Sequence, residues 1–293
     1  MFDPKEYQLL DFGDGRRLER FGDVTLDRPA PAAERFRPAD VERWDESNAR
    51  FLRGRKKTGR WEGRAPENWE IRHGRAVFEL HRSPFGHLGV FPEQADNWDR
   101  IDRAVRQLQE SLGRPPVVLN LFAYTGGSTL AAALAGAEVT HVDAAGNTVA
   151  RARKNAELSG LADAPIRWIV EDALKFVKRE VKRDRRYDGI ILDPPSYGHG
   201  AKGQVWRLSN HLAPLLRNCL QLTVDSPSRF VLLTCHTPGY EHRTLKEILT
   251  EELDRCGEDR PTTPKIDTRA MSITAATDKR FPAGDAVFMT EFS

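Results

Sequence analysis

Three aspartates each stand at the end of a short apolar run: Asp143, Asp172 and Asp193. A carboxylate that ends a strand before a helix can accept hydrogen bonds from ribose hydroxyls, which is the chemistry we expect for Asp143. Asp172, followed by Ala173, could accept a hydrogen bond from the exocyclic amine of adenine. Either side chain could instead cap the helix that follows it. These residues predict an adenosine site, with helix capping as the competing interpretation.

A glycine-containing turn lies between a strand and a helix in the segment NLFAYTGGST (120–129). Glycine lets the backbone approach a ligand closely, and a helix N-terminus offers unpaired N–H groups. The segment is neither the GxGxxG pattern of dinucleotide-binding folds nor a Gly-Lys-Ser/Thr phosphate loop. We therefore expect a ligand that carries adenosine without a pyrophosphate. The missing glycine pattern also disfavours a nicotinamide dehydrogenase.

The segment DPPSYG (193–198) combines a carboxylate, two prolines and an aromatic side chain. Pro194 and Pro195 stiffen the loop and remove two backbone donors. Its carbonyl oxygens, together with Asp193, could hold an amine or the edge of a base. Tyr197 could stack on a planar base. The alternative interpretation is a structural turn.

Alternating strands and helices must position these residues, and they begin near residue 95. Near-continuous apolar strands separated by helices indicate a parallel sheet that is covered on both faces. We predict a doubly wound α/β domain whose ligand lies at the carboxyl ends of the strands. The predicted strands are 117–122, 138–143, 166–172, 187–193 and 229–235, with two more at 272–274 and 285–292. The predicted helices are 96–112, 128–137, 147–159, the basic segment after 172, 205–224 and 240–256.

The N-terminal part has a different pattern. Two alternating runs, 18–28 and 69–82, surround the turns Gly22-Asp23 and His73-Gly74 and predict β-hairpins. Between them, apolar residues from 41 to 52 follow a roughly helical spacing after Pro38. Residues 29–38 are rich in Pro and Ala and predict a linker or an exposed loop. We predict two domains, a small β-rich domain over 1–85 and an α/β domain over 86–293.

The composition is typical of a globular protein: the chain has 293 residues, a formal net charge of +2, and 39% hydrophobic residues. The three cysteines form no CxxC pair, which argues against a disulfide framework and a four-thiolate zinc site. No HExxH pairing is present either, so we expect no metal. The N-terminus lacks the pattern of a secretory signal, and no apolar run is long enough to span a membrane. We expect a cytoplasmic protein.

Two basic clusters stand out from this balanced charge. Residues 50–75 carry nine Lys or Arg against three acids, and residues 175–186 carry seven against two. Such clusters are typical of surfaces that bind polyanions, although either could be only a solvated face. Trp61 and Trp69 lie within the first cluster, which suits nucleic acid better.

The motifs N-L-F-A-Y-T-G-G, Asp143, Asp172-Ala173 and D-P-P-S-Y resemble those of class I S-adenosylmethionine-dependent methyltransferases. More narrowly, residues 85–293 are similar to the branch related to bacterial large-subunit ribosomal RNA methyltransferases, including its 5-methylcytosine enzymes. The resemblance implies a Rossmann-like sheet of seven strands whose last pair forms an antiparallel hairpin. The small RNA-binding domain found at the start of many relatives is not evident in residues 1–85, which look like a different β module.

The resemblance also implies residue roles. The segment 122–127 would bind the methionine part of S-adenosylmethionine, Asp143 the ribose, Asp172 the adenine, and Asp193 the region near the sulfonium. The segment GVFPEQADNWDRI (89–101) resembles the family segment in which a Gln approaches the cofactor. The implied cofactor-binding residues are Gln94, Phe122, Tyr124, Thr125, Gly126, Gly127, Asp143, Ala144, Asp172, Ala173 and Asp193. The implied substrate-binding residues are Pro194, Pro195, Ser196, Tyr197 and Lys202.

Two acceptor chemistries fit these residues. The family places the nucleophile of its 5-methylcytosine enzymes at the end of the fifth strand, where this chain has Cys235 in LLTCHT (232–237). A thiolate that adds at C6 of cytosine activates C5 as a carbon nucleophile. Relatives usually have Ser after this Cys, and this chain has His236; Cys235 could also be a buried structural cysteine. Alternatively, the Asp193 loop could hold an exocyclic amine, although amine-methylating enzymes usually have an aromatic residue where this chain has Ser196.

The expected function is S-adenosylmethionine-dependent methylation of RNA, most simply ribosomal RNA, with Cys235 and Asp193 as catalytic residues. Amine methylation through the Asp193 loop is the alternative enzyme. A module that binds RNA without catalysis is the alternative from a different class.

Overall fold

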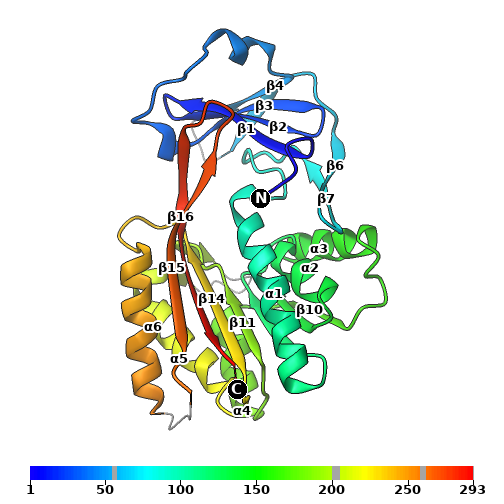
Figure 1. Ribbon diagram of the computed structural model, residues 1–293. Helices are drawn as coiled ribbons and strands as arrows, with labels where there is room; N and C mark the ends of the chain where they lie inside the picture. Colours follow the sequence, from blue (N-terminus) through cyan, green and yellow to red (C-terminus); the bar gives the residue numbers. More distant parts are fainter. Residues whose placement is uncertain (55–57, 200–204, 258–261, 293) are drawn as a thin grey trace. The chain divides into compact units, whose positions relative to one another are not determined.

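The computed structural model describes residues 1–54, 58–199, 205–257 and 262–292, and Figure 1 shows its ribbon. The chain divides into two compact units. The first unit comprises Met1–Asp96 and Met271–Ala283, and the second comprises Asn97–Ala270 and Gly284–Ser293. The sequence contains no signal that joins residues 271–283 to the N-terminal part. The predicted domains, 1–85 and 86–293, stay a prediction.

The first unit is built on a five-stranded sheet in the order β1-β2-β3-β4-β5, accompanied by a separate pair, β6-β7. Both predicted hairpins are confirmed, because β2 pairs antiparallel with β3 and β6 pairs antiparallel with β7. The strands are β1 (Tyr7–Gly13), β2 (Arg16–Phe21), β3 (Val24–Pro29), β4 (Ala49–Arg53), β5 (Gly59–Gly63), β6 (Asn68–His73) and β7 (Ala76–His81).

The helical interpretation of residues 38–52 is wrong. Only a short 3-10 turn (Glu42–Glu46) forms there, and the residues after it are strand β4. Phe51 is buried in β4 because β4 pairs with β3 on one side and β5 on the other. Pairing with strands distant in sequence outweighs the local helical spacing.

A seven-stranded sheet, formed mainly by residues of the second unit, has the order β10-β9-β8-β11-β14-β16-β15. The first five strands in this order are parallel, and β16 runs antiparallel to β14. The predicted doubly wound sheet of seven strands is confirmed. The strands are β8 (Val117–Leu121), β9 (Glu138–Asp143), β10 (Ile166–Val170), β11 (Gly189–Leu192), β14 (Arg229–Cys235), β15 (Lys265–Thr274) and β16 (Arg280–Glu291).

Six helices among the described residues cover this sheet: α1 (Ala95–Leu112), α2 (Gly127–Leu134), α3 (Gly146–Leu158), α4 (Ala173–Lys182), α5 (Leu208–Gln221) and α6 (His242–Cys256). Helices α1, α2 and α3 lie on one face and α4, α5 and α6 on the other (Figure 1). All residues of β11 and β14 are buried, because a strand covered on both faces has no side exposed to water. In the described part of the chain, no helix is long and apolar enough to cross a membrane.

One short hairpin is absent from the sequence prediction. Strand β12 (Tyr197–His199) pairs antiparallel with β13 (Val205–Arg207), so the segment 205–207 is a strand rather than the start of a helix. This hairpin follows directly from the Asp-Pro-Pro segment and places Trp206 opposite Gly198. The side chain of Trp206 is thereby brought back to the carboxyl edge of the sheet.

A buried ion pair connects strands β14 and β16. Arg229 and Glu291 are 1% and 2% exposed, and Arg229 Nε donates to Glu291 Oε2 at 2.9 Å. The hydroxyl of Thr262 donates to the other carboxylate oxygen of Glu291 at 2.6 Å. Charges this deeply buried are stable only while each keeps its partner.

We therefore expect Glu291→Ala to lower the free energy of unfolding by about 3–5 kcal/mol, because Arg229 would remain buried without its carboxylate. Urea denaturation of the full chain measures this change. The matched control is Glu251→Ala, whose carboxylate is 67% exposed in its pair with Arg255 and which should cost about 0.5 kcal/mol or less. Equal losses in the two variants would contradict the expectation.

Candidate active site

The loop after β8 has an unusual backbone. Phe122 and Tyr124 have φ values of +55° and +49°, and Gly126 has +93°. Positive φ is uncommon in residues other than glycine, so the surroundings must hold this loop in place. Three hydrogen bonds do so: Ala123 N–H donates to the carbonyl of Val142 at 3.1 Å, Tyr124 N–H donates to Asp143 Oδ2 at 2.9 Å, and Asn155 Nδ2 donates to the carbonyl of Thr125 at 3.0 Å.

Asp143 lies where the sequence predicts it, at the end of β9. Its two carboxylate oxygens accept hydrogen bonds from the backbone of Tyr124 and of Ala145, each at 2.9 Å. Burial raises the pKa of the Asp143 carboxyl, and the two backbone hydrogen bonds oppose that shift. Each oxygen keeps a second lone pair, so the carboxylate can still accept a hydroxyl group.

An exposed apolar side chain stands beside Asp143, and the sequence analysis does not identify it. Val170 is the register partner of Asp143 on β10 and is 54% exposed. A Cβ at Gly146, the first residue of α3, would lie 3.8 Å from Val170. A carboxylate next to open apolar surface is the combination that a ribose and a flat purine ring require. The residues present therefore fit the adenosine part of the predicted cofactor.

Gly126 and Gly127, in the loop after β8, each occupy a position where a larger side chain would be unfavourable. A Cβ at Gly127 would lie 2.4 Å from the ring of Trp98, which is buried on α1. Gly126 has a positive φ, and a Cβ there would lie 3.1 Å from that of Ala152 on α3. These close approaches bring the first turn of α2 against both neighbouring helices.

Asp172 is the N-cap of α4, and its carboxylate accepts a hydrogen bond from Lys175 N–H at 2.9 Å. The capping interpretation is thus confirmed. A role in binding adenine remains a prediction, because one carboxylate oxygen can cap the helix while the other accepts from a ligand. Ala173 is buried in the first turn of α4, and Ala144 follows Asp143 in the β9–α3 loop.

Asp193 lies at the end of β11, beside the end of β14. The hydroxyl of Thr234 donates to Asp193 Oδ1 at 2.6 Å, and His236 Nε2 lies 3.6 Å from the same oxygen. The Asp193 side chain is 33% exposed, so it is held from one side and open to solvent on the other. Sequence analysis misses Thr234, because a threonine within an apolar strand carries no distinctive signal.

Cys235 is the last residue of β14 and is only 1% exposed. Burial raises the pKa of its thiol, and the nearby carboxylates of Asp193 and Asp285 add to this effect. The backbone N–H of Thr237 donates to Cys235 Sγ at 3.5 Å. The thiol is therefore adjacent to Asp193 but largely protonated near neutral pH.

The Asp-Pro-Pro segment forms an anchored loop. Pro194 is buried, the carbonyl of Pro195 accepts a hydrogen bond from Trp206 Nε1 at 2.6 Å, and the hydroxyl of Ser196 lies 2.7 Å from that of Thr237. Tyr197 is 47% exposed, so its side chain is partly open to solvent. Lys202 lies outside the described residues.

Trp206 links this loop to the loop after β8. Its indole ring packs on Phe122, with the ring centroids 4.9 Å apart, while its N–H holds Pro195. The sequence analysis assigns residues 205–224 largely to helix and so misses this role.

Gln94 is buried at the end of a 3-10 turn in the first unit, and its role toward the cofactor remains a prediction.

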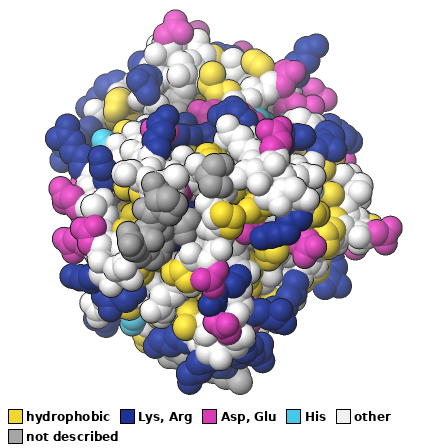
Figure 2. Space-filling view, turned by 60° about the horizontal axis from the view of Figure 1, so that its bottom comes forward, with side chains coloured by type: hydrophobic (Ala, Val, Ile, Leu, Met, Phe, Trp, Pro, Cys, Tyr) yellow, Lys and Arg dark blue, Asp and Glu magenta, His cyan; other side chains and the backbone are white. Residues whose placement is uncertain are grey.

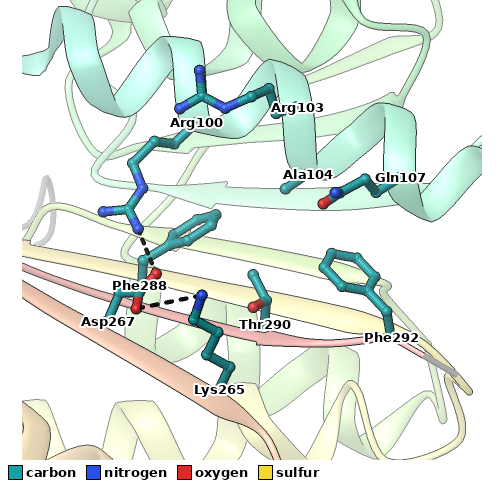
Figure 3. Close-up of a pocket in the computed structure, with 9 residues that line it drawn as sticks. All are labelled: Arg100, Arg103, Ala104, Gln107, Lys265, Asp267, Phe288, Thr290 and Phe292. Atoms are coloured by element: carbon teal, nitrogen blue, oxygen red, sulfur yellow. Dashed lines mark hydrogen bonds and ion pairs between the residues drawn. The ribbon is translucent and has the colours of Figure 1, made fainter.

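A separate pocket of about 400 Å³ lies between α1 and the strands β15 and β16 (Figure 3). Arg100 crosses it, donates to Asp267 at 2.9 Å and lies over the ring of Phe288 at 4.8 Å. None of the residues predicted for the site lines it. The guanidinium of Arg100 and the carboxylate of Asp267 bind each other, so we do not assign the predicted chemistry to this pocket.

Among the described residues, no group of His, Cys, Asp and Glu could hold a metal ion.

The arrangement on the second unit now has a counterpart among known proteins. The family described as S-adenosylmethionine-dependent methyltransferase matches residues 29–252. The chain belongs to this family. Its cofactor is S-adenosylmethionine, as the sequence predicts. The fold agrees with a crystal structure of an S-adenosylmethionine-dependent methyltransferase from Agrobacterium tumefaciens, which is 34% identical, with a TM-score of 0.85 over 98% of this chain and 90% of that one.

Curated relatives confirm the predicted similarity to ribosomal RNA large subunit methyltransferases. Methyltransferase K/L of Pseudoalteromonas atlantica is 32% identical over 154 residues, which are 52% of this chain and 20% of the relative. Methyltransferase I of Aeromonas hydrophila is 35% identical over 114 residues, which are 38% of this chain and 27% of the relative. The chain thus matches about a fifth to a quarter of the length of these two relatives.

The environment of Cys235 generates a prediction about thiol reactivity. At pH 7.5, iodoacetamide should alkylate the partly exposed Cys256 at least about tenfold faster than Cys235, because burial both shields the Cys235 sulfur and raises its pKa. Because the pKa of Cys235 is raised, its alkylation rate should continue to increase with pH above about 8.5, the ordinary pKa of a thiol. Mass spectrometry of the labelled peptides measures both rates. Labelling of Cys235 as fast as Cys256 would show an exposed thiolate instead.

Proposed function

We propose that this protein transfers a methyl group from S-adenosylmethionine to a base of RNA, and that the RNA is large-subunit ribosomal RNA. The observation that carries the proposal is the meeting of Asp143, Asp193 and the anchored Asp-Pro-Pro loop at the carboxyl ends of neighbouring parallel strands. The names of the curated relatives support the choice of RNA. A ribosomal RNA substrate would also place the protein in the cytoplasm.

The cofactor would be held by the chain as follows. Asp143 would accept the ribose hydroxyls, Val170 would supply apolar surface to the adenine, and the loop 122–127 would surround the methionine part. When bound, S-adenosylmethionine supplies an electrophilic methyl group. The hydrogen bonds that fix Phe122 and Tyr124 at positive φ make this loop rigid before any ligand arrives, and a rigid site loses less entropy on binding.

On the substrate side, the residues orient a base. The carbonyl oxygens of the Asp-Pro-Pro loop and the carboxylate of Asp193 would accept from an exocyclic amine, while Tyr197 would stack on the ring. For methylation at C5 of cytosine, the Cys235 sulfur would lose its proton and add to C6, which makes C5 nucleophilic. After C5 takes the methyl group, loss of the C5 proton would restore the C5–C6 double bond and release the sulfur. His236, whose Nε2 lies 3.6 Å from Asp193 Oδ1, would take part in removing the thiol proton.

The cofactor assignment is tested by Asp143→Ala. The variant should bind S-adenosylmethionine at least about tenfold more weakly in isothermal titration calorimetry, because charge-assisted hydrogen bonds to the ribose are lost.

The affinity of the wild-type protein for S-adenosylmethionine should fall as the pH is lowered, because protonation removes the acceptor. The fall should begin at a higher pH than the ordinary pKa of an aspartate would give, because burial raises the Asp143 pKa. Asp163→Ala, an exposed aspartate on a loop of the same unit, is the control and should leave the affinity unchanged. If neither S-adenosylmethionine nor S-adenosylhomocysteine binds the wild-type protein, an RNA-binding module without catalysis becomes the better proposal.

The carbon acceptor is tested by Cys235→Ala. Transfer of labelled methyl groups to extracted large-subunit RNA should fall at least about a hundredfold, since the covalent step needs the sulfur. Cys256→Ala should keep the wild-type rate. If Cys235→Ala retains full turnover, the covalent mechanism is wrong and amine methylation through the Asp193 loop takes its place; analysis of the methylated nucleoside then identifies the nitrogen.

A further inference from the structure

A basic groove runs along α4 in the second unit, with a volume of about 530 Å³. We call it the α4 groove and define it by the six lining residues that matter here: Lys175, Lys178, Arg179, Lys182, Val205 and Trp206. The four cations lie on one helix, spaced three, one and three residues apart. They extend over about 10 Å along the helix axis, given a rise of 1.5 Å per residue.

The positive charge of this groove is only partly neutralised by the protein itself. Lys175 and Arg179 share a single carboxylate, that of Glu171, at 3.3 and 3.1 Å. Among the residues that the structure describes, Lys178 and Lys182 have no ion-pair partner, and both are exposed. Like charges four residues apart on a helix repel each other, so this pair does not stabilise α4. The arrangement is suited to an anion supplied from outside.

The α4 groove is directly connected to the two loops of the candidate active site. Its lining includes Trp206, which donates a hydrogen bond to Pro195 and packs on Phe122. Its wall includes Asp172, the residue predicted to lie near the adenine. An extended chain in the groove would therefore lead to the loop that orients the acceptor base. Val205, 41% exposed, offers apolar surface for a base or ribose on the way.

In the other basic cluster predicted from the sequence, several of the described side chains have partners within their own unit. Arg50 pairs with Asp27, Arg60 with Glu62 and Arg72 with Glu70. The indole N–H groups of Trp61 and Trp69 donate to backbone carbonyls. Lys and Arg side chains are also spread over much of the face seen in Figure 2. Charge alone therefore does not single out a surface, whereas unpaired charge along a groove beside the active-site loops does.

We propose that the α4 groove binds the phosphate backbone of single-stranded RNA next to the base that is methylated. This inference rests on the proposed function. A row of cations along about 10 Å of helix matches two successive phosphates of a chain rather than the single phosphate of a mononucleotide. A base that is presented by its edge to the Asp-Pro-Pro loop must be unpaired, and unpaired bases are found in the single-stranded segments of a folded RNA.

The test is the double variant Lys178→Gln/Lys182→Gln, with a labelled 20-nucleotide single-stranded RNA as the probe. Fluorescence anisotropy should show affinity reduced on the order of tenfold at low salt. The slope of log affinity against log salt should become less steep by about 1.4, because each lost phosphate contact on a single strand contributes about 0.7. With extracted large-subunit RNA, the KM should rise while kcat stays unchanged. If the double variant unfolds, Lys182→Gln alone should show half the change in slope.

The matched control removes the same charge from another helix of the unit, Arg243→Gln/Lys246→Gln on α6, where both side chains are exposed. It should leave RNA affinity within about twofold. S-adenosylmethionine affinity should be unchanged in both variants, which shows that the fold and the cofactor site are intact.

Three outcomes overturn the groove assignment: an unchanged salt slope in the α4 variant, an equal loss in the α6 control, or displacement of the RNA by polyglutamate as effective as that by unlabelled RNA. If the wild-type protein methylates RNA and the α4 variant shows the same KM, the groove fails and the proposed function stands. If the wild-type protein transfers no methyl group to RNA but the lysines still determine RNA affinity, the proposed function fails and the groove stands.

Discussion

The carboxylate of Asp143 accepts hydrogen bonds from backbone N–H groups on two loops, and the site depends on this double contact. One bond comes from Tyr124, in the loop after β8, and the other from Ala145, just before α3. The first of these holds a segment in which two residues other than glycine have positive φ. Without a partly buried acceptor at this point, the loop would relax toward ordinary backbone conformations and its N–H groups would lose their fixed directions.

Single side chains also hold the loops on which substrate-binding residues are predicted. Trp206 satisfies its own N–H with the carbonyl of Pro195 and packs its ring on Phe122, so one side chain fixes the spacing of both loops. Thr234 fixes Asp193 in the same manner from the adjacent strand. These contacts are short and partly shielded from water, where a hydrogen bond orients its partners more strongly than at an exposed surface. The groups that would face cofactor and base are therefore positioned by hydrogen bonds and packing from neighbouring side chains.

Charge is arranged in two different ways in this chain. Deep in the second unit, Arg229 and Glu291 neutralise each other completely, because an isolated charge there would be prohibitively costly. Along α4, by contrast, Lys178 and Lys182 remain exposed and unpaired within the described residues. A buried pair serves stability, while exposed unpaired charge is available to a polyanion.

The sequence by itself determines the α/β alternation, the parallel sheet and the aspartates at the strand ends. It can do so because parallel strands end at one edge, so residues that follow different strands must meet there. The tertiary structure alone decides what surrounds them. Residues 49–53 form a strand, against their helical spacing, because β3 and β5 are available to pair with them. Trp206, Thr234 and Val170 have no local signal, since their roles arise from neighbours distant in sequence. Burial of the Cys235 thiol is likewise a property of packing, which no single segment of the chain encodes.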